Sequence, residues 1–367
     1  MRELTRHWSL VTLHASPFTY NFASSFNRAN RGTSMTALAR IGITMGDPSG
    51  VGPEIIVKAL QEMSPEHRSA TAVIGNLDFL KRADKLVGAN LSYTDQFDNA
   101  RGGVVPVAHV PTKDMARITD GQITEAGGEA AYQYVAKAVE LALAGKIAVI
   151  VTAPLNKGAM HLAGHHFDGH TELLAHLTGA KSSFMLLASD KLSAVHVSTH
   201  VSLRGATERA TTERVLATIR AGNEHFKALG FANPRIAVAG LNPHCGEGGI
   251  FGNEEIERIN RGVELAQQEG INVKGPISGD TVFYRALKGE FDLVVAQFHD
   301  QGHIPTKLIA FDETVNVSLG LPIRRTSVDH GTAFDIAWQG KASHVNMRAA
   351  VAYARMMADR MPARAAA

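Results

Sequence analysis

The sequence predicts an α/β protein built on a mostly parallel sheet. Two observations lead to this prediction: short apolar runs alternate with helical segments along the chain, and three apolar runs in the second half end on a histidine. Strands that alternate with helices are typical of parallel sheets whose faces the helices cover. A chain of 367 residues exceeds the size at which one core stops growing, so we expect two domains with a cleft between them.

The first half is expected to begin with a strand, a turn and a helix. Residues 40–45 read as a buried strand, and a glycine-rich turn at 46–52 follows it. Pro53 and Glu54 then favour a helix start, because proline suits the first helical position and an acid suits the first turn. Further strands are predicted at 72–75, 104–110 and 148–151, with an alanine-rich helix at 127–144.

The second half continues the alternation. Helices are predicted at 211–229 and 254–268, and strands at 235–240, near 293 and near 315. The chain has no internal repeat and no low-complexity linker, so topology alone suggests where the domains divide. We expect residues 35–155 plus 315–367 to form a first α/β domain, and residues 156–314 to form a second.

Composition excludes several classes of partner. The 37 basic and 35 acidic residues leave a net charge of +2 with no basic block, which argues against nucleic acid. The longest apolar runs fall far short of the roughly 20 residues that a membrane-spanning helix needs. The one cysteine, Cys245, excludes an internal disulfide framework and a cysteine-based zinc cluster. A soluble cytoplasmic protein without membrane partners is therefore expected.

Residues 1–34 differ from the rest in composition. They contain arginines and serines with a single acid, Glu3, and no strand is predicted before Ile41. We expect a disordered extension ahead of a second candidate start at Met35. A transit peptide is the alternative that this composition leaves open.

Three histidines at strand ends are the main functional feature. In an open α/β sheet, ligands bind outside the carboxyl ends of the strands, so His200, His244 and His299 can converge there. Three imidazoles at one point predict a metal site, and three protein ligands leave positions open for a substrate oxygen. A hydrogen-bonded structural histidine is the alternative for each of them taken alone.

Several charged or polar residues are candidates for binding an anion or moving a proton. The apparent helix that starts at His170-Thr171 offers free N–H groups to an anion, although a plain capped helix explains the same pattern. Lys307 and Arg325 are candidates for holding a phosphate or carboxylate, with a solvated surface as the alternative. Lys157 follows a strand directly and either enters the cleft or simply turns the chain. Asp280 and Asp300 could orient ligands or move protons.

The chain lacks the glycine fingerprint of a Rossmann dinucleotide site. The turn at 46–52 has a different spacing, and Phe251 stands where the third glycine after Gly246 and Gly248 is required. Any nicotinamide cofactor must therefore bind by another fold.

Six segments together resemble the 4-hydroxythreonine-4-phosphate dehydrogenase family, which includes a D-threonate/D-erythronate 4-phosphate dehydrogenase branch. The resemblance runs from about residue 40 to the end, and the segments keep the family's order. It implies two α/β/α domains with a cleft, similar to the isocitrate and isopropylmalate dehydrogenases and not a Rossmann fold. The segments are Ile43–Glu54, Thr152–Lys157, Gly169–Glu172, Gly240–Glu247, His299–Gly302 and Arg325–Ala333.

The resemblance also implies site residues. His200, His244 and His299 match the metal ligands, one of which reaches a metal held mainly by the partner subunit, so a homodimer with a shared active site is expected. Zinc suits three imidazoles best, while cobalt, nickel, manganese or magnesium stay open. Substrate contacts are implied at His170, Thr171, Lys307, Asn316 and Arg325. The loop 330–336 looks like a non-Rossmann nicotinamide loop, with His330, Gly331, Thr332 and Asp335 as the cofactor-binding residues.

The implied reaction is the oxidation of the secondary alcohol of a small, four-carbon, 4-phosphorylated hydroxy acid, followed by decarboxylation, with NAD or NADP and a divalent metal. Lys307 or Asp280 is the predicted proton-transfer group. The substrate of the family type, in vitamin B6 (pyridoxine) biosynthesis, carries an amine at carbon 2, and the sugar-acid substrate carries a hydroxyl. Segments 196–200 and 302–305 look closer to the sugar-acid branch. A metal-dependent hydrolase or aldolase acting on a phosphate ester is the alternative of another class.

Three residues depart from the family pattern. Cys245 stands in place of a usual alanine, Trp338 in place of a usual glycine, and Asp168 in place of a usual proline. Trp338 puts the choice between NAD and NADP in doubt. Cys245 is expected to be a small packed residue without a redox role.

Overall fold

The computed structural model describes residues 38–361, so the predicted extension at 1–34 lies outside the described residues. The strands are β1 Ile41–Thr44, β2 Thr71–Gly75, β3 Tyr93–Thr94, β4 Val105–His109, β5 Val149–Thr152, β6 Phe184–Ala188, β7 Ser193–His196, β8 Ile236–Ala239, β9 Val273–Ile277, β10 Leu293–Ala296, β11 Val315–Leu319 and β12 Arg325–Ser327. The longer helices are α2 Gly52–Gln61, α4 Leu77–Val87, α5 Glu125–Leu143, α7 His170–Thr178, α9 Thr212–Ala228, α10 Asn260–Gln268, α11 Gly279–Leu287, α12 His299–Ala310 and α13 Val345–Arg360. The short ones are α3 Pro65–Ser69, α6 Lys157–Leu162 and α8 Leu203–Arg209.

All predicted strands and helices are present, within a few residues of the expected bounds. The strands form one 12-stranded sheet in the order β3-β4-β2-β1-β5-β12-β11-β6-β7-β10-β8-β9. Most neighbours are parallel, as predicted, but β6 pairs antiparallel with β7 and β11, and β11 pairs antiparallel with β12. The predicted helix at 254–268 begins with a π-helical turn at Glu255–Ile259 before α10.

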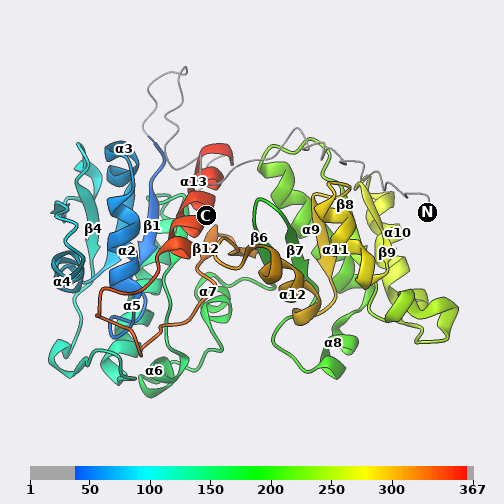
Figure 1. Ribbon diagram of the computed structural model, residues 1–367, viewed down its shortest axis with the longest axis horizontal. Coiled ribbons are helices and arrows are strands. Elements are labelled where there is room, and N and C mark those ends of the chain that lie inside the picture. The colour runs from blue at the N-terminus through cyan, green and yellow to red at the C-terminus, as the bar shows by residue number, and fades with distance from the viewer. Residues whose placement is uncertain (1–37, 362–367) are drawn as a thin grey trace, which may run out of the picture.

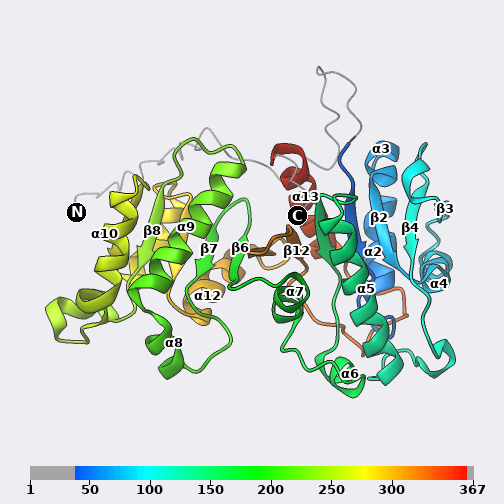
Figure 2. The same ribbon diagram turned by 180° about the vertical axis from the view of Figure 1, so that it is seen from behind.

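Strand alternation divides the core between the two faces of the sheet. Val149 and Val151 of β5 belong to a cluster that also contains α2, α9 and α13, while Ile150 belongs to a second cluster under α5 and α7. Successive side chains of a strand point to opposite faces, so these clusters lie on opposite sides. Figure 1 shows α2 and α13 in front of the sheet, and Figure 2 shows α5 and α7 on the reverse side.

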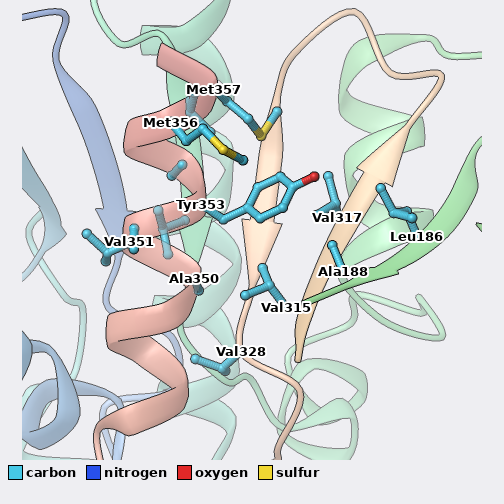
Figure 3. Packing of buried hydrophobic residues seen from close by; sticks show 14 of the residues in the cluster. Leu186, Ala188, Val315, Val317, Val328, Ala350, Val351, Tyr353, Met356 and Met357 are labelled. Carbon is cyan, nitrogen blue, oxygen red and sulfur yellow. The ribbon is translucent and has the colours of Figure 1, made fainter. Parts of the chain in front are cut away.

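The centre of the molecule is packed around Tyr353 of α13. Its ring extends toward Val315 and Val317 of β11 (Figure 3), and it is fully buried. The Tyr353 hydroxyl lies 2.8 Å from His225 Nε2 of α9, and the two rings are stacked 6.0 Å apart. This contact joins α13, which covers β5 and β12, to a helix that covers β10 and β7.

Candidate functional site

A buried arginine lies at the centre of the sheet. Arg325 of β12 is 2 % exposed, and its guanidinium donates to Thr152 Oγ1 at 2.7 and 3.1 Å and to Ser318 Oγ at 3.1 Å. These acceptors are neutral, and Arg325 makes no ion pair within residues 38–361. Burial lowers the pKa of Arg325 to about 9, and nearby Glu172 opposes this only in part. The site can therefore accommodate an anion beside Arg325.

Two of the predicted substrate residues, Asn316 and His170, lie near this arginine. Asn316 is on the same face of β11 as Ser318, which pairs with Arg325 across the antiparallel ladder. Asn316 Oδ1 and His170 Nε2 are both buried and without a hydrogen-bond partner in the part of the chain that the structure describes. Burial, followed by the charge of Arg325, holds the pKa of His170 well below its usual range, so its imidazole is neutral. These are open hydrogen-bonding positions for a bound molecule.

Helix α7 begins without a side-chain cap. Its N-cap is Gly169, and no side chain accepts from the first N–H groups, so the capping alternative for Thr171 is not what the structure shows. Thr171 is half-buried beside His170. The free N–H groups of this helix start agree with the predicted anion-binding role.

Lys307 lies next to the predicted cofactor loop. Its Nζ is 2.9 Å from Asp329 Oδ2, the residue that directly precedes His330. The cofactor loop packs on the 46–52 turn that follows β1. Val51 N donates to Thr332 O at 3.0 Å, and Trp338 Nε1 donates to Pro48 O at 2.9 Å. The buried 46–52 turn and the 330–340 loop are thus packed against each other.

The loop residues differ in exposure. His330, Gly331 and Asp335 are exposed and Thr332 is buried. Trp338 has a φ of +59°, a conformation that glycine adopts without strain, and the Arg82 guanidinium lies 4.0 Å from its ring centroid. The conformation explains why glycine suits this position, and the contacts to Pro48 and Arg82 hold tryptophan there.

Two of the three predicted metal ligands are neighbours. The rings of His200 and His299 lie 5.9 Å apart, and Asp300 Oδ1 is 2.7 Å from His299 Nδ1. Burial lowers the pKa of His200, which favours the neutral imidazole that binds metals. The bond to Asp300 leaves Nε2 of His299 as the nitrogen available for a metal, an arrangement usual for metal-bound histidines.

The third predicted ligand, His244, lines a pocket of about 230 Å³ together with Asp280, and neither His200 nor His299 lines this pocket. Gln301 of α12 also lines this pocket. Residues 244–248 all have positive φ, between +43° and +78°, so His244 is presented by a left-handed turn that includes non-glycine residues. Among the described residues, no group of three histidine, cysteine, aspartate or glutamate side chains is arranged to hold a metal within one chain.

The sequence reasoning assigned no role to two further histidines. His196 of β7 and His303 of α12 are buried, with ring centroids 4.7 Å apart, and His303 stacks on His299 at 3.6 Å. Burial lowers the pKa of His196 to about 3 and that of His303 to about 4. The spacing of His299 and His303 by four residues, once a helix was assigned there, would have placed both on one helix face.

Asp47 was also missed. Its side chain is fully buried in the turn after β1, where Oδ1 accepts from Ser49 N at 2.9 Å and Oδ2 has no partner within residues 38–361. A side chain on Gly127 would lie 2.7 Å from Asp47 Oδ1, so the carboxyl group contacts the first turn of α5. Burial raises the pKa of Asp47 to about 6.

Comparisons with known proteins agree on one family. The family of the pyridoxal phosphate biosynthetic protein PdxA matches residues 67–354. The chain is 45% identical to a D-threonate 4-phosphate dehydrogenase of Pectobacterium atrosepticum, over 87% of this chain and 99% of that protein. It is 45% identical to a 4-hydroxythreonine-4-phosphate dehydrogenase of Geobacter metallireducens, over 87% and 95%. A crystal structure of 4-hydroxythreonine-4-phosphate dehydrogenase from Klebsiella pneumoniae superposes with a TM-score of 0.79 at 41% identity, over 87% and 99%.

Proposed function

Because this chain belongs to the PdxA family and is an oxidoreductase, we propose that it oxidises and decarboxylates a four-carbon, 4-phosphorylated 3-hydroxy acid. The reaction uses NAD or NADP and a divalent metal ion. The observation that carries this proposal is Arg325, a buried cation without an anionic partner within residues 38–361. A substrate phosphate or carboxylate supplies the missing charge, and the arginine fork can hold it through two hydrogen bonds.

The residues around Arg325 complete the substrate site. His170 Nε2 and Asn316 Oδ1 offer acceptors to substrate hydroxyl groups, Thr171 adds a hydroxyl, and the uncapped start of α7 adds N–H groups. Lys307 is the group that we expect to move a proton at its Nζ. Asp329 holds that Nζ beside the cofactor loop, which fits this role better than the position of Asp280 in the His244 pocket.

The donor set fits a divalent metal, with zinc as the preferred ion. His200 and His299 offer two neutral imidazoles, and Asp300 orients the second. When bound, such an ion supplies Lewis acidity to the substrate oxygens. Thr332 and the exposed His330, Gly331 and Asp335 would hold the nicotinamide cofactor, where the loop packs on the 46–52 turn.

A homodimer would complete the metal site. Ile304 and Leu308 of α12, with Phe311 at its C-cap, form an exposed apolar stripe, with 55%, 81% and 69% of each residue accessible. Stripes of this kind on helices mark interfaces. We propose that a second copy covers the stripe and that one of the three histidines, His200, His244 or His299, reaches the metal from the other subunit. Sedimentation should show a dimer that Leu308→Asp dissociates, and a wild-type monomer would contradict this.

The sheet order supports the proposed domain division. Strands of residues 35–155 and 315–367 occupy one side of the β11–β6 pair, and strands of residues 156–314 occupy the other. Among the described residues no helix is both long and apolar enough to cross a bilayer. A cytoplasmic location is proposed because the near relatives are bacterial enzymes acting on small phosphorylated acids.

Two kinds of substrate are the candidates. 4-Hydroxythreonine-4-phosphate, the family type, is named for the Geobacter relative, and D-threonate 4-phosphate is named for the Pectobacterium relative. D-erythronate 4-phosphate is the other substrate of the sugar-acid branch. The two kinds differ in the amine or hydroxyl at carbon 2. The test is to incubate the purified protein with NAD or NADP, a divalent metal and each phosphate, and to follow reduced nicotinamide by absorbance. Metal-dependent product without reduced cofactor would instead indicate a hydrolase or aldolase.

A further inference from the structure

Two buried histidines link the sheet to the helix that carries His299. His196 ends β7, and its Nδ1 lies 3.1 Å from Met185 O of β6. On its other side, Nε2 lies 3.2 Å from Nδ1 of His303 on α12. The same His303 Nδ1 lies 3.0 Å from the backbone oxygen of His299. A chain of hydrogen bonds therefore runs from β6 through both imidazoles to the first turn of α12.

The acceptors fix the tautomer of both rings. A carbonyl oxygen only accepts, so His196 Nδ1 must carry a hydrogen that it donates to Met185 O. Its Nε2 is then an acceptor. His303 Nδ1 must likewise carry a hydrogen, which it donates to His299 O and to His196 Nε2. Each ring is held by two neighbours and cannot rotate without breaking a buried hydrogen bond.

The His303 ring in turn contacts His299. The two rings are stacked with centroids 3.6 Å apart and planes 13° apart. In addition, Asp300 Oδ1 lies 2.7 Å from His299 Nδ1. Gly302 permits the approach, since a Cβ at this position would lie 2.2 Å from His196 Nε2. The helix can lie this close to His196 only because residue 302 has no side chain.

We propose that His196 and His303 are positioning residues that hold the His299 imidazole in the orientation required to bind the divalent ion. This inference rests on the proposed function, in which His299 is a metal ligand. His303 sets the plane of the His299 ring by stacking, His196 anchors His303 to the sheet, and Asp300 sets the rotation of the ring through Nδ1. Groups that orient a metal ligand in this way typically change metal affinity by about 10- to 100-fold when removed.

A purely structural role makes a different prediction. If the pair served only to fill the space between β7 and α12, its replacement would reduce stability and leave metal affinity unchanged. His225 provides the matched control, because it is also a buried histidine whose Nε2 is hydrogen-bonded and whose ring is stacked, but its partner is Tyr353.

The test is titration of the metal-free protein with Co²⁺ alone, followed by its visible absorption spectrum. We expect about 10-fold weaker Co²⁺ binding and an altered spectrum in His303→Leu and in His196→Leu. His303→Phe retains a planar ring over His299 and should therefore recover part of the Co²⁺ affinity. If His303→Leu does not fold, His303→Phe is the variant in which Co²⁺ affinity is measured. His225→Phe should lower the unfolding temperature without changing Co²⁺ affinity.

The outcomes separate this inference from the proposed function. Wild-type protein that binds no Co²⁺, or a His299→Ala variant that binds as wild type does, would contradict the metal assignment itself. If His299→Ala loses binding while the His303 and His196 variants bind as wild type does, the positioning role is wrong and the metal assignment holds. An equal loss of affinity in His225→Phe would also overturn the positioning role.

Discussion

The guanidinium of Arg325 is the residue-scale feature with the clearest functional consequence. It is held by the hydroxyls of Thr152 and Ser318, which cannot neutralise it. A buried charge without an opposite charge beside it lowers the free energy of unfolding. A bound anion that pairs with Arg325 would offset this cost. The open positions at His170 and Asn316 point to the same conclusion.

Replacing Arg325 by methionine should therefore separate binding from stability. We expect Arg325→Met to lower kcat/KM by at least about 30-fold, mainly through KM, because a charge pair with a substrate anion is worth about 2 kcal/mol or more. The free energy of unfolding should not fall, because the unpaired charge is removed. Steady-state kinetics and denaturant unfolding measure the two effects. Arg220→Met, which removes a surface arginine paired with Glu269, is the control and should leave KM unchanged.

Asp47 gives a prediction about pH. Burial raises its pKa in the folded protein from 3.8 to about 6, so the folded state favours the protonated form. The contribution to stability is then fully present below about pH 4 and is lost as the pH rises through about 6. A shift of this size corresponds to about 3 kcal/mol. Asp47→Asn keeps the acceptor for Ser49 N and lacks the charge.

We accordingly expect Asp47→Asn to gain stability over wild type as the pH rises from about 4 to about 7. Denaturant unfolding at several pH values measures the difference. The exposed Asp95→Asn serves as control and should follow wild type across the range. A constant difference between Asp47→Asn and wild type would contradict the assignment of the raised pKa.

At the scale of elements, the passage of α12 over β7 depends on Gly302. Alanine normally stabilises a helix relative to glycine, but here its Cβ would lie 2.2 Å from His196 Nε2. We expect Gly302→Ala to destabilise the protein by about 2 kcal/mol, because overpacking displaces the helix or the histidine. Thermal and denaturant unfolding measure the loss.

A double variant tests the cause of that loss. His196→Ala makes room for the new methyl group, so the double variant should be more stable than the sum of the two single effects predicts. Gly331→Ala is the control, since its Cβ would meet no atom within 4 Å. Strict additivity in the double variant would show that the clash is not the cause.

Element prediction from the sequence succeeded where the pattern is local. The strand at Ile41–Thr44 and the helix behind Pro53 follow from a buried run and a favourable first turn, and both are present. The antiparallel pairing of β6 with β11 could not be predicted, because it joins residues more than a hundred positions apart. Alternation of strands and helices carries no information on such pairing.

The candidate site shows the same division. The family motifs predicted Arg325, His170 and Asn316 as substrate residues. The structure places Asn316 and Arg325 on paired strands, and His170 lies close enough to Arg325 for the arginine charge to lower the pKa of the imidazole. His196 and Asp47 escaped notice because their roles arise from burial and from partners distant in sequence. The shared metal site of His200, His244 and His299 stays a prediction. Among the described residues of one chain, the three histidines are not arranged as a metal site.

At the scale of the whole molecule, the Tyr353–His225 hydrogen bond connects the helices of two regions. Tyr353→Phe removes the hydroxyl and leaves a buried imidazole nitrogen without this partner. We expect a loss of about 1 to 2 kcal/mol in the free energy of unfolding, because buried polar groups are costly when unsatisfied. Urea unfolding measures it. The exposed Tyr284→Phe should have no effect, and equal stability of Tyr353→Phe and wild type would contradict the link.

The shared sheet has a consequence for motion. Five consecutive residue pairs join β11 to β6, the two strands at which the halves of the sheet meet. The two halves of the sheet cannot hinge apart freely between β11 and β6, because such an opening would break a continuous ladder of backbone hydrogen bonds. Rearrangement on substrate arrival should instead appear as a change of twist in the central strands, while their amide protons stay protected from exchange.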